Sequence, residues 1–178
     1  MAAQTLDAMD DTETSEPPEP APGGEKPPGV TLDLIDPESR LTPAQRAWVL
    51  DHARRALGAI DAAGEARVKV VGDSEMALAH ELHKNVPGTT DVLTFDLEPD
   101  DDTLLDADIL VCADEAARQG ERLGHAPERE LLLYIIHGVL HCAGYDDTDE
   151  ASARAMHRRE DELLTLAGVG ATYAKDDR

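Results

Sequence analysis

Two histidines four residues apart, His137 and His141, are the residues whose types and spacing most clearly point to chemistry. Residues four apart on a helix project from the same face, so the two imidazoles would lie one turn from each other. Gly144 can take the left-handed conformation that ends a helix and reverses the chain, which would bring Asp146 or Asp147 back towards the histidines. Two imidazoles and one carboxylate leave an open position for water, as in a catalytic site for zinc or another divalent metal.

Two other interpretations of this segment remain open. His137 and His141 could be two partly buried core histidines beside a helix cap. The spacing also matches the extended zinc site of metalloproteases, in which a glutamate directly after the first histidine is the general base. That position is Gly138 in this chain, so a peptidase would need its base from elsewhere.

The histidine pair lies in a strongly apolar segment, and alternating short strands and helices precede it. Apolar residues surround both histidines, which predicts a helix over residues 128–143 that is buried on nearly all sides. Strands are expected at residues 30–34, 66–71, 92–95 and 107–111, and further helices at 42–57, 73–84, 113–123 and 149–167. This order predicts an α/β (α+β) fold, with a mixed sheet of about four strands covered by about five helices and the metal site at the C-terminal end of a buried helix.

The composition of the 178-residue chain limits the classes of protein to which it can belong. Sixteen Lys and Arg against 38 Asp and Glu give a formal net charge of -22, which argues against broad basic coverage of a nucleic acid. Residues 1–29 hold six of the eleven prolines and seven acidic side chains, and we expect them to form a disordered tail. The folded domain is expected over residues 30–170, with a polar end at 171–178. Two cysteines, the lack of a signal-peptide pattern and the lack of an apolar run of spanning length favour a cytoplasmic protein without membrane contact.

Several motifs of this chain resemble those of the YbeY family, the metal-dependent endoribonucleases of bacterial ribosomal RNA maturation. The segment from His137 to Asp147 resembles the family signature H-G-x-L-H-x-x-G-Y-D-H. Upstream, residues 89–95 resemble the strand P-T-D-V-L-S-F, and residues 106–109 resemble the strand L-G-D-I. Met156 and Glu160 resemble the M-x-x-x-E that follows the metal motif. The similarity covers about residues 66 to 164, with the motifs in the family's order.

The resemblance implies hydrolysis of single-stranded RNA, a ribosomal RNA precursor, in ribosomal RNA maturation and ribosome quality control. One divalent metal, zinc by preference, would be held by His137, His141 and Asp147, with Asp146 as the fallback ligand. The ribosome or its proteins would be partners, and DNA is not expected as a substrate. Asp146 could instead orient the water, or only cap the turn.

This chain departs from the family pattern at three positions. Asp147 stands where the family usually has a third histidine, so the bound water should be less acidic than at a site with three histidines. Lys84 aligns with the family's arginine; it would stabilise charge on the phosphate without a bidentate fork. Thr89 replaces a proline. These departures keep a second function open, a ribosome-associated assembly factor with a structural metal and little catalysis.

The other basic, histidine and cysteine residues have weaker functional interpretations. A positive strip for RNA, or separately solvated charges, could be formed by Arg67, Lys69, Lys84, Arg118, Arg122 and Arg129. His80 and His83 are expected to be surface residues, and His125 could line the cleft. Cys142 is expected to point away from the metal, and Cys112 to belong to the core.

Overall fold

The computed structural model describes residues 29–97 and 104–173. Almost all of the predicted N-terminal tail and the last five residues therefore lie outside the described part of the chain. Nine elements follow one another in the order β1 (Val30–Ile35), α1 (Pro43–Leu57), β2 (Ala63–Val71), α2 (Asp73–Lys84), β3 (Val92–Asp96), β4 (Leu104–Cys112), α3 (Ala113–Leu123), α4 (Pro127–Cys142) and α5 (Glu150–Leu166). The predicted four strands and five helices are confirmed. Among the described residues, no helix is both long and apolar enough to cross a membrane.

The four strands form one mixed sheet in the order β1-β2-β4-β3. β1 and β2 are parallel, as are β2 and β4, whereas β3 is antiparallel to β4. Val68 of β2 lies opposite Leu34 of β1 and Ile109 of β4, and Ile109 also faces Thr94 of β3. These residues point to one face of the sheet, because successive side chains of a strand alternate between its two faces.

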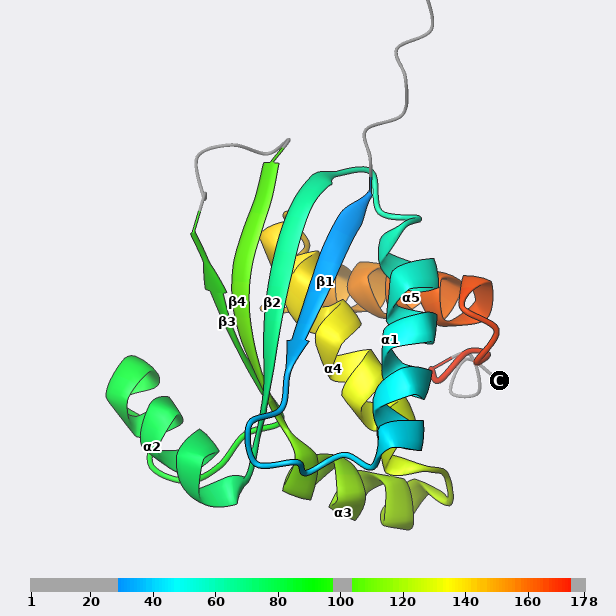
Figure 1. Cartoon of the computed structure of the whole chain (residues 1–178). Coiled ribbons are helices and arrows are strands. Elements are labelled where there is room, and N and C mark those ends of the chain that lie inside the picture. The colour runs from blue at the N-terminus through cyan, green and yellow to red at the C-terminus, as the bar shows by residue number, and fades with distance from the viewer. Residues whose placement is uncertain (1–28, 98–103, 174–178) are drawn as a thin grey trace, which may run out of the picture.

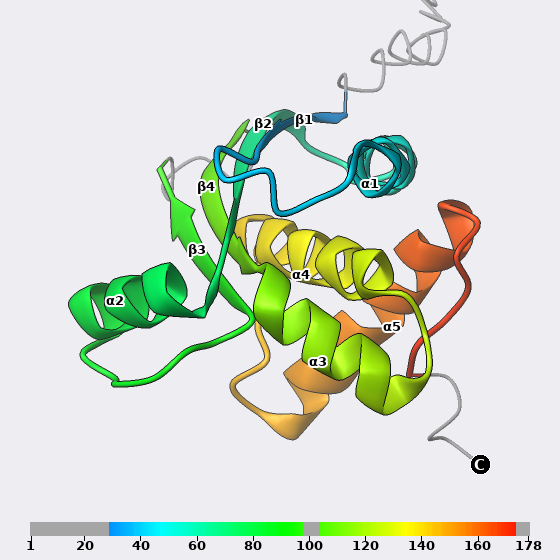
Figure 2. The same cartoon turned by 60° about the horizontal axis from the view of Figure 1, so that its bottom comes forward.

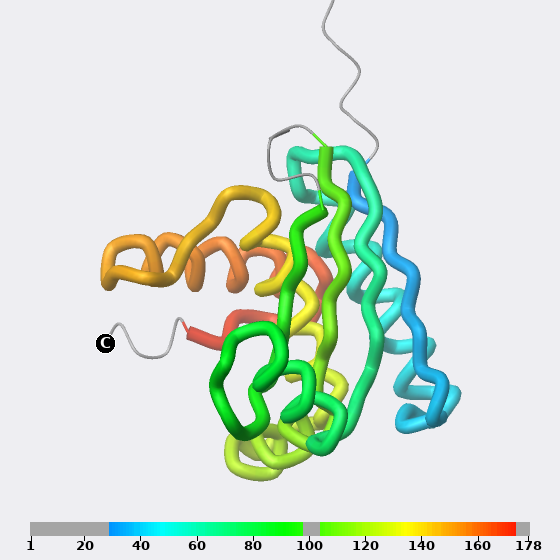
Figure 3. Tube along the Cα trace, turned by 90° about the vertical axis from the view of Figure 1, so that its left-hand side faces the viewer, coloured from blue at the N-terminus to red at the C-terminus, as the bar shows by residue number. Residues whose placement is uncertain are grey.

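Helices cover this face in two layers. α1 and α4 lie against the sheet, and α5 lies beyond α4 (Figure 1). The view in Figure 2 shows α3 crossing below α4, with the chain after α5 returning towards it. α2 packs at one end of the opposite face, where Met76 is buried with Val71, Leu93 and Cys112. Figure 3 shows α2 in front of the lower end of the sheet, below α5.

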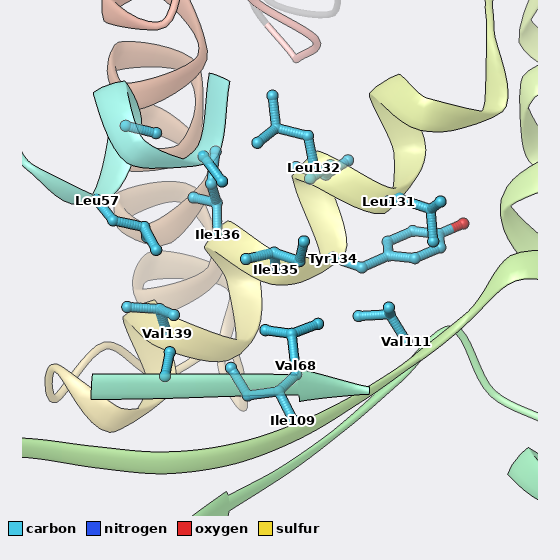
Figure 4. Packing of buried hydrophobic residues seen from close by; sticks show 14 of the residues in the cluster. Leu57, Val68, Ile109, Val111, Leu131, Leu132, Tyr134, Ile135, Ile136 and Val139 are labelled. Atoms are coloured by element: carbon cyan, nitrogen blue, oxygen red, sulfur yellow. The ribbon is translucent and has the colours of Figure 1, made fainter. Parts of the chain in front are cut away.

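α4 is the central helix because apolar residues surround it on nearly every side. In Figure 4 its side chains Ile135 and Val139 face Val68 and Ile109 of the sheet, and Ile136 points towards Leu57 of α1. All six side chains are at most 1% exposed to solvent. Burying an aliphatic side chain of this size stabilises a fold by roughly 1.5–3 kcal/mol, so α4 is held firmly in position.

The start of α1 shows how local sequence sets an element boundary. Thr42 accepts a hydrogen bond from the Gln45 backbone N–H at 3.2 Å, and the Gln45 side chain accepts one from the Thr42 N–H at 3.0 Å. Pro43 occupies the first helical turn, where its missing N–H costs nothing. This reciprocal capping box ends the preceding loop at a defined residue and confirms the predicted start of the helix.

Candidate metal centre and RNA-cleavage site

A tight turn at the end of α4 brings an acidic segment back towards the helix. Gly144 has φ +85°, in the left-handed region that glycine adopts without strain. Its N–H donates to the His141 carbonyl at 3.1 Å, and the Tyr145 N–H donates to the Leu140 carbonyl at 3.0 Å. These two bonds form the Schellman motif that satisfies the last carbonyls of a helix. The predicted reversal of the chain at Gly144 is confirmed.

The turn places one carboxylate beside the two imidazoles. The Nε2 atoms of His137 and His141 lie 3.1 Å apart. Oδ2 of Asp147 lies 3.8 Å from Nε2 of His137, and Oδ1 lies 3.9 Å from Nε2 of His141. Within residues 29–97 and 104–173, no further His, Cys, Asp or Glu joins this group of possible metal ligands. The structure thus brings together the three residues that the family resemblance implies as ligands, and of the two aspartates that the spacing left open it places Asp147 beside the histidines.

The outer nitrogens of both rings are held by groups that only accept hydrogen bonds. Nδ1 of His137 lies 2.7 Å from Oε1 of Glu160, and Nδ1 of His141 lies 3.2 Å from the Tyr145 carbonyl. A carboxylate and a carbonyl accept hydrogen bonds, so in each neutral ring Nδ1 carries the proton and Nε2 keeps its lone pair. Two lone pairs therefore face each other across 3.1 Å.

This donor set fits a metal ion well. Facing lone pairs repel each other, and a shared cation removes that repulsion. Tetrahedral zinc with Zn–N bonds of about 2.0–2.1 Å needs two nitrogens about 3.3–3.4 Å apart, close to the distance between the two Nε2 atoms. The Asp147 oxygens lie about half an ångström beyond that spacing, and this side chain is partly exposed at 43% in a turn, where a small movement is possible.

Glu160 of α5 holds His137 from behind. It is 0% exposed, and its second oxygen, Oε2, has no hydrogen-bond partner in the described chain. Burial lowers the pKa of His137, but the hydrogen bond and charge of Glu160, with Asp147 and Asp91, outweigh burial and raise that pKa overall. A carboxylate behind a ligating histidine is a common support for metal sites, because it fixes the ring and increases its basicity.

The sequence analysis named Glu160 only as part of a motif that resembles the family's. It did not predict that Glu160 would contact His137. A signal was nevertheless present. Glu160 follows Met156 by four residues and precedes Leu163 and Leu164 by three and four, so it lies on the apolar face of its helix. A single acidic residue on a buried face needs a partner, because an unpaired buried charge is costly.

Gly138 has a packing role that excludes the general base of metalloproteases. A Cβ at this position would lie 2.8 Å from Oγ1 of Thr94 and 3.2 Å from two side-chain carbons of Ile109. α4 therefore approaches β3 and β4 so closely that even a Cβ would force the side chain of Thr94 or Ile109 to shift. The glutamate that a zinc peptidase carries here has neither a position in the sequence nor space in the structure.

Lys84 lines the same pocket as the two histidines. This pocket, which we name the Lys84 pocket, has a volume of about 440 Å³ and is also lined by Asp91, Thr94, Asp96 and Cys142. Lys84 makes no ion pair with any described residue and lines the pocket, so its ammonium is available to an anion. Cys142 lines the pocket but is not among the clustered donors; burial raises its pKa to about 12, so it stays a thiol.

Asp146 is bound to the turn rather than to the histidines. Its Oδ1 accepts from the backbone N–H groups of Asp147 at 2.8 Å and Thr148 at 3.2 Å, and its Oδ2 accepts from the Thr148 hydroxyl at 2.5 Å. The Thr148 bond is the main cause of the lowered pKa of Asp146. The geometry therefore shows the capping role, and a role in orienting water stays a prediction.

Most of the residues considered for a positive strip are occupied by other groups. Arg67 pairs with Asp106 and Asp108, Lys69 with Glu75, and Arg118 with Asp73 and Glu115. Arg129 donates to carbonyls after α5, and Arg122 donates to Gln119. The structure favours separate charges over a continuous basic strip: Arg67, Lys69 and Arg118 are paired with carboxylates, whereas Arg122 and Arg129 bind neutral groups of the described chain.

The remaining histidines lie outside the cluster. Nδ1 of His80 is 2.9 Å from the Gly88 carbonyl, His83 packs edge-on against Phe95, and Nε2 of His125 is 3.0 Å from Oε1 of Glu130. His125 lines neither the Lys84 pocket nor the neighbouring pocket that Tyr134 and Tyr173 line. Cys112 is fully buried, as expected.

Comparison with known proteins agrees with this geometry. The sequence model described as "Endoribonuclease YbeY" matches residues 39–168. The chain belongs to the YbeY family. An endoribonuclease YbeY of Thermobifida fusca is 35% identical over 158 residues, covering 84% of this chain and 94% of the relative. One from Acidothermus cellulolyticus is 34% identical over 149 residues, covering 77% and 85%.

A solved structure shows the same fold. The solution structure of TM1509 from Thermotoga maritima matches with a TM-score of 0.50 and 21% identity, covering 82% of this chain and 91% of that one. The resemblance inferred from the sequence motifs is therefore confirmed at the level of the YbeY family, whose listed members are named as endoribonucleases.

Proposed function

We propose that this protein is a metal-dependent endoribonuclease that hydrolyses phosphodiesters of single-stranded RNA in ribosomal RNA maturation. The observation that supports this most directly is the pair of Nε2 atoms 3.1 Å apart with the Asp147 carboxylate beside them. Membership of a family of endoribonucleases supplies the substrate class. Precursor ribosomal RNA, the ribosome as partner and a cytoplasmic location belong to the same proposal.

The proposed roles follow from the contacts of each residue. His137, His141 and Asp147 would hold one divalent metal, with zinc favoured by the nitrogen-rich donor set. When bound, such an ion polarises a phosphoryl oxygen and lowers the pKa of a water molecule. Glu160 and the Tyr145 carbonyl keep the two Nε2 atoms pointing at a common centre. Lys84 would bind a non-bridging phosphate oxygen and stabilise charge that develops on it.

The number of ligands favours catalysis over a purely structural metal. Structural zinc sites have four protein ligands, whereas catalytic ones have three and leave a position for water or substrate. Three donors converge in the described chain, and this site borders the Lys84 pocket. The alternative function, an assembly factor with a structural metal, therefore has less support.

The strongly acidic chain can still bind RNA if the positive charge is local. A bound divalent ion with two neutral histidines and one aspartate has a formal charge of +1, and Lys84 adds a second positive charge at the pocket, which Asp91 and Asp96 in the lining partly offset. Steering depends on this local field more than on the total of -22. Few phosphates would be contacted, so binding should depend less steeply on salt than in proteins with broad basic surfaces.

His141→Ala tests the proposal directly. Because one of three donors is lost, we expect the purified variant to lose its bound metal and its RNA cleavage together, as measured by elemental analysis and by cleavage of a labelled single-stranded RNA with and without chelator. His52→Ala is the matched control, because His52 stacks on Trp48 outside the cluster. Undiminished cleavage by His141→Ala after loss of the metal would contradict the mechanism.

A further inference from the structure

A second pocket adjoins the Lys84 pocket at His137. Thr90, Asp91 and His137 line both pockets, so a ligand that passes His137 can extend into either. The second pocket has a volume of about 500 Å³, within the usual range for a small-molecule site. Its walls come from α3, α4, the segment before β3 and the segment after α5, which approach one another in Figure 2. We name it the Tyr134 pocket.

Tyr134 contributes a buried hydroxyl, close to the Glu130 carboxylate, to the lining of this pocket. The residue is 5% exposed, and its hydroxyl has no hydrogen-bond partner in the described chain. Figure 4 shows the ring among the buried apolar residues and the hydroxyl pointing away from them. Burial, and then the charge of Glu130, raise the pKa of Tyr134, so the hydroxyl stays protonated and can donate. An unpaired buried donor is costly, and an acceptor on a ligand would remove that cost.

The charges of the Tyr134 pocket favour a neutral ligand over a phosphate. Asp91, Glu115 and Glu130 contribute three carboxylates to the lining, whereas Arg122 contributes one guanidinium. A phosphate would be repelled here, in contrast to the Lys84 pocket beside the metal ligands. A planar ring with hydrogen-bonding edges avoids this repulsion and can use both the Tyr134 hydroxyl and the carboxylates.

An aromatic wall of the pocket is already fixed in position. Tyr173 lines the pocket, and its ring stacks on His157 with centroids 3.9 Å apart and an interplanar angle of 7°. The preceding backbone is held by Arg129, whose Nη2 donates to the Gly170 and Ala171 carbonyls at 3.1 and 3.0 Å. Asp161 accepts from the Tyr173 N–H at 3.0 Å. A wall that is ordered in advance lowers the entropy cost of binding.

We propose that the Tyr134 pocket binds an unpaired nucleobase next to the phosphodiester that lies at His137. The inference rests on the proposed function, because an endonuclease must bind its strand on both sides of the bond it cleaves. Unpaired bases offer free edges for hydrogen bonds and faces for stacking on aromatic side chains, whereas bases within a duplex do not. The pocket therefore gives this site both a preference for single strands and a contact with one flanking base.

Tyr134→Phe tests the pocket by removing only the hydroxyl. The substrate is an unstructured 12-nucleotide RNA, compared with versions that carry one abasic nucleotide on either side of the mapped cleavage position. On intact RNA we expect kcat/KM to fall about 3- to 10-fold, the effect of one neutral hydrogen bond. On the RNA that is abasic on the pocket side, the variant and the unchanged protein should cleave equally, because the partner of the hydroxyl is gone.

Tyr173→Leu provides a second variant that removes the aromatic face. Loss of stacking should lower kcat/KM on intact RNA about 5-fold or more, again with no loss on the abasic RNA. Metal content and melting temperature of Tyr134→Phe should match the unchanged protein, which separates a binding role from a structural one. Equal losses on intact and abasic RNA, or no loss on either, would overturn the pocket assignment and leave the nuclease proposal standing.

Binding measurements separate the two proposals if the unchanged protein does not cleave RNA. Fluorescence anisotropy would compare the 12-nucleotide RNA with a ribose-phosphate chain that lacks all bases. The base pocket would be supported, even though the nuclease proposal had failed, by two results together. The RNA would bind more tightly than the chain without bases, and Tyr134→Phe would reduce that difference. Equal binding of the two chains, or no binding of either, would overturn the base pocket together with the proposed function.

Discussion

Replacing Glu160 by glutamine should weaken metal binding without removing any metal ligand. The carboxylate is fully buried, and its Oε1 lies 2.7 Å from Nδ1 of His137. Glutamine has nearly the same size and can still accept the bond, but it lacks the negative charge that favours a cation on the far side of the ring. Substitution of such supporting groups typically lowers metal affinity about 10- to 100-fold, or about 1.4–2.7 kcal/mol.

The metal-free protein should respond differently from the loaded one. Oε2 of Glu160 has no hydrogen-bond partner in the described chain, so the unchanged protein already carries the cost of desolvating that oxygen. Glu160→Gln removes a buried charge, and we expect the melting temperature of the metal-free form to change little. With metal in excess, the bound ion should stabilise Glu160→Gln by up to about 2.7 kcal/mol less than it stabilises the unchanged protein. The reason is that stabilisation by a ligand follows the logarithm of its affinity.

Zinc affinity would be measured by competition with a chromogenic chelator, and stability by thermal unfolding with and without zinc. Glu162→Gln is the matched control, since it makes the same chemical change two residues away on α5, at a side chain that is 63% exposed and paired with Arg159. Unchanged zinc affinity of Glu160→Gln, or an equal loss in Glu162→Gln, would refute the argument that the buried carboxylate tunes His137.

Two further predictions concern packing and acid stability. Gly138→Ala should destabilise the fold by about 1–3 kcal/mol in chemical denaturation, because its Cβ would lie 2.8 Å from Oγ1 of Thr94, and Thr94→Ala in the same chain should recover part of the loss. Arg118 lowers the pKa of Asp73, and with a Gln119 hydrogen bond as the larger cause it also lowers the pKa of Glu115. A carboxyl whose pKa is lower in the folded state stabilises the fold above its ordinary pKa, 3.8 for Asp73 and 4.5 for Glu115, and this stabilisation is lost as the pH falls through the folded value. In Arg118→Ala the free energy of unfolding should therefore fall less steeply as the pH drops below about 4.5. A fall as steep as that of the unchanged protein, measured by denaturant unfolding at each pH, would contradict this.

The sequence predicted the parts of the site that depend on local geometry. A helical spacing of four residues is sufficient to align His137 and His141, and a glycine two residues after the end of the helix is sufficient to reverse the chain towards Asp147. The helix predicted over 128–143 is α4, with bounds at Pro127 and Cys142. These features need no knowledge of distant residues.

Features that depend on tertiary contacts were predicted less well. β2 and β4 are nine residues each and extend beyond the predicted apolar segments, because backbone pairing such as Ala63 with Leu104 continues where the side chains no longer alternate clearly. The partner of Glu160 could not be identified from its spacing, since His137 lies on another helix. The charges of Arg67 and Arg118 are neutralised by residues about 40 positions away, so a list of basic residues overestimated the positive surface.

The position of Glu160 on the last helix makes the metal-binding motif depend on residues well beyond it. A shortened chain that stopped before α5 would retain His137, His141 and Asp147, and its sequence would still contain the complete motif. In that fragment the ring of His137 would lose its anchor and could rotate, so the ligands would have to be ordered by the ion itself. If the proposed metal binds, docking of the last helix and capture of the cation would therefore be coupled events, each slowing the release of the other.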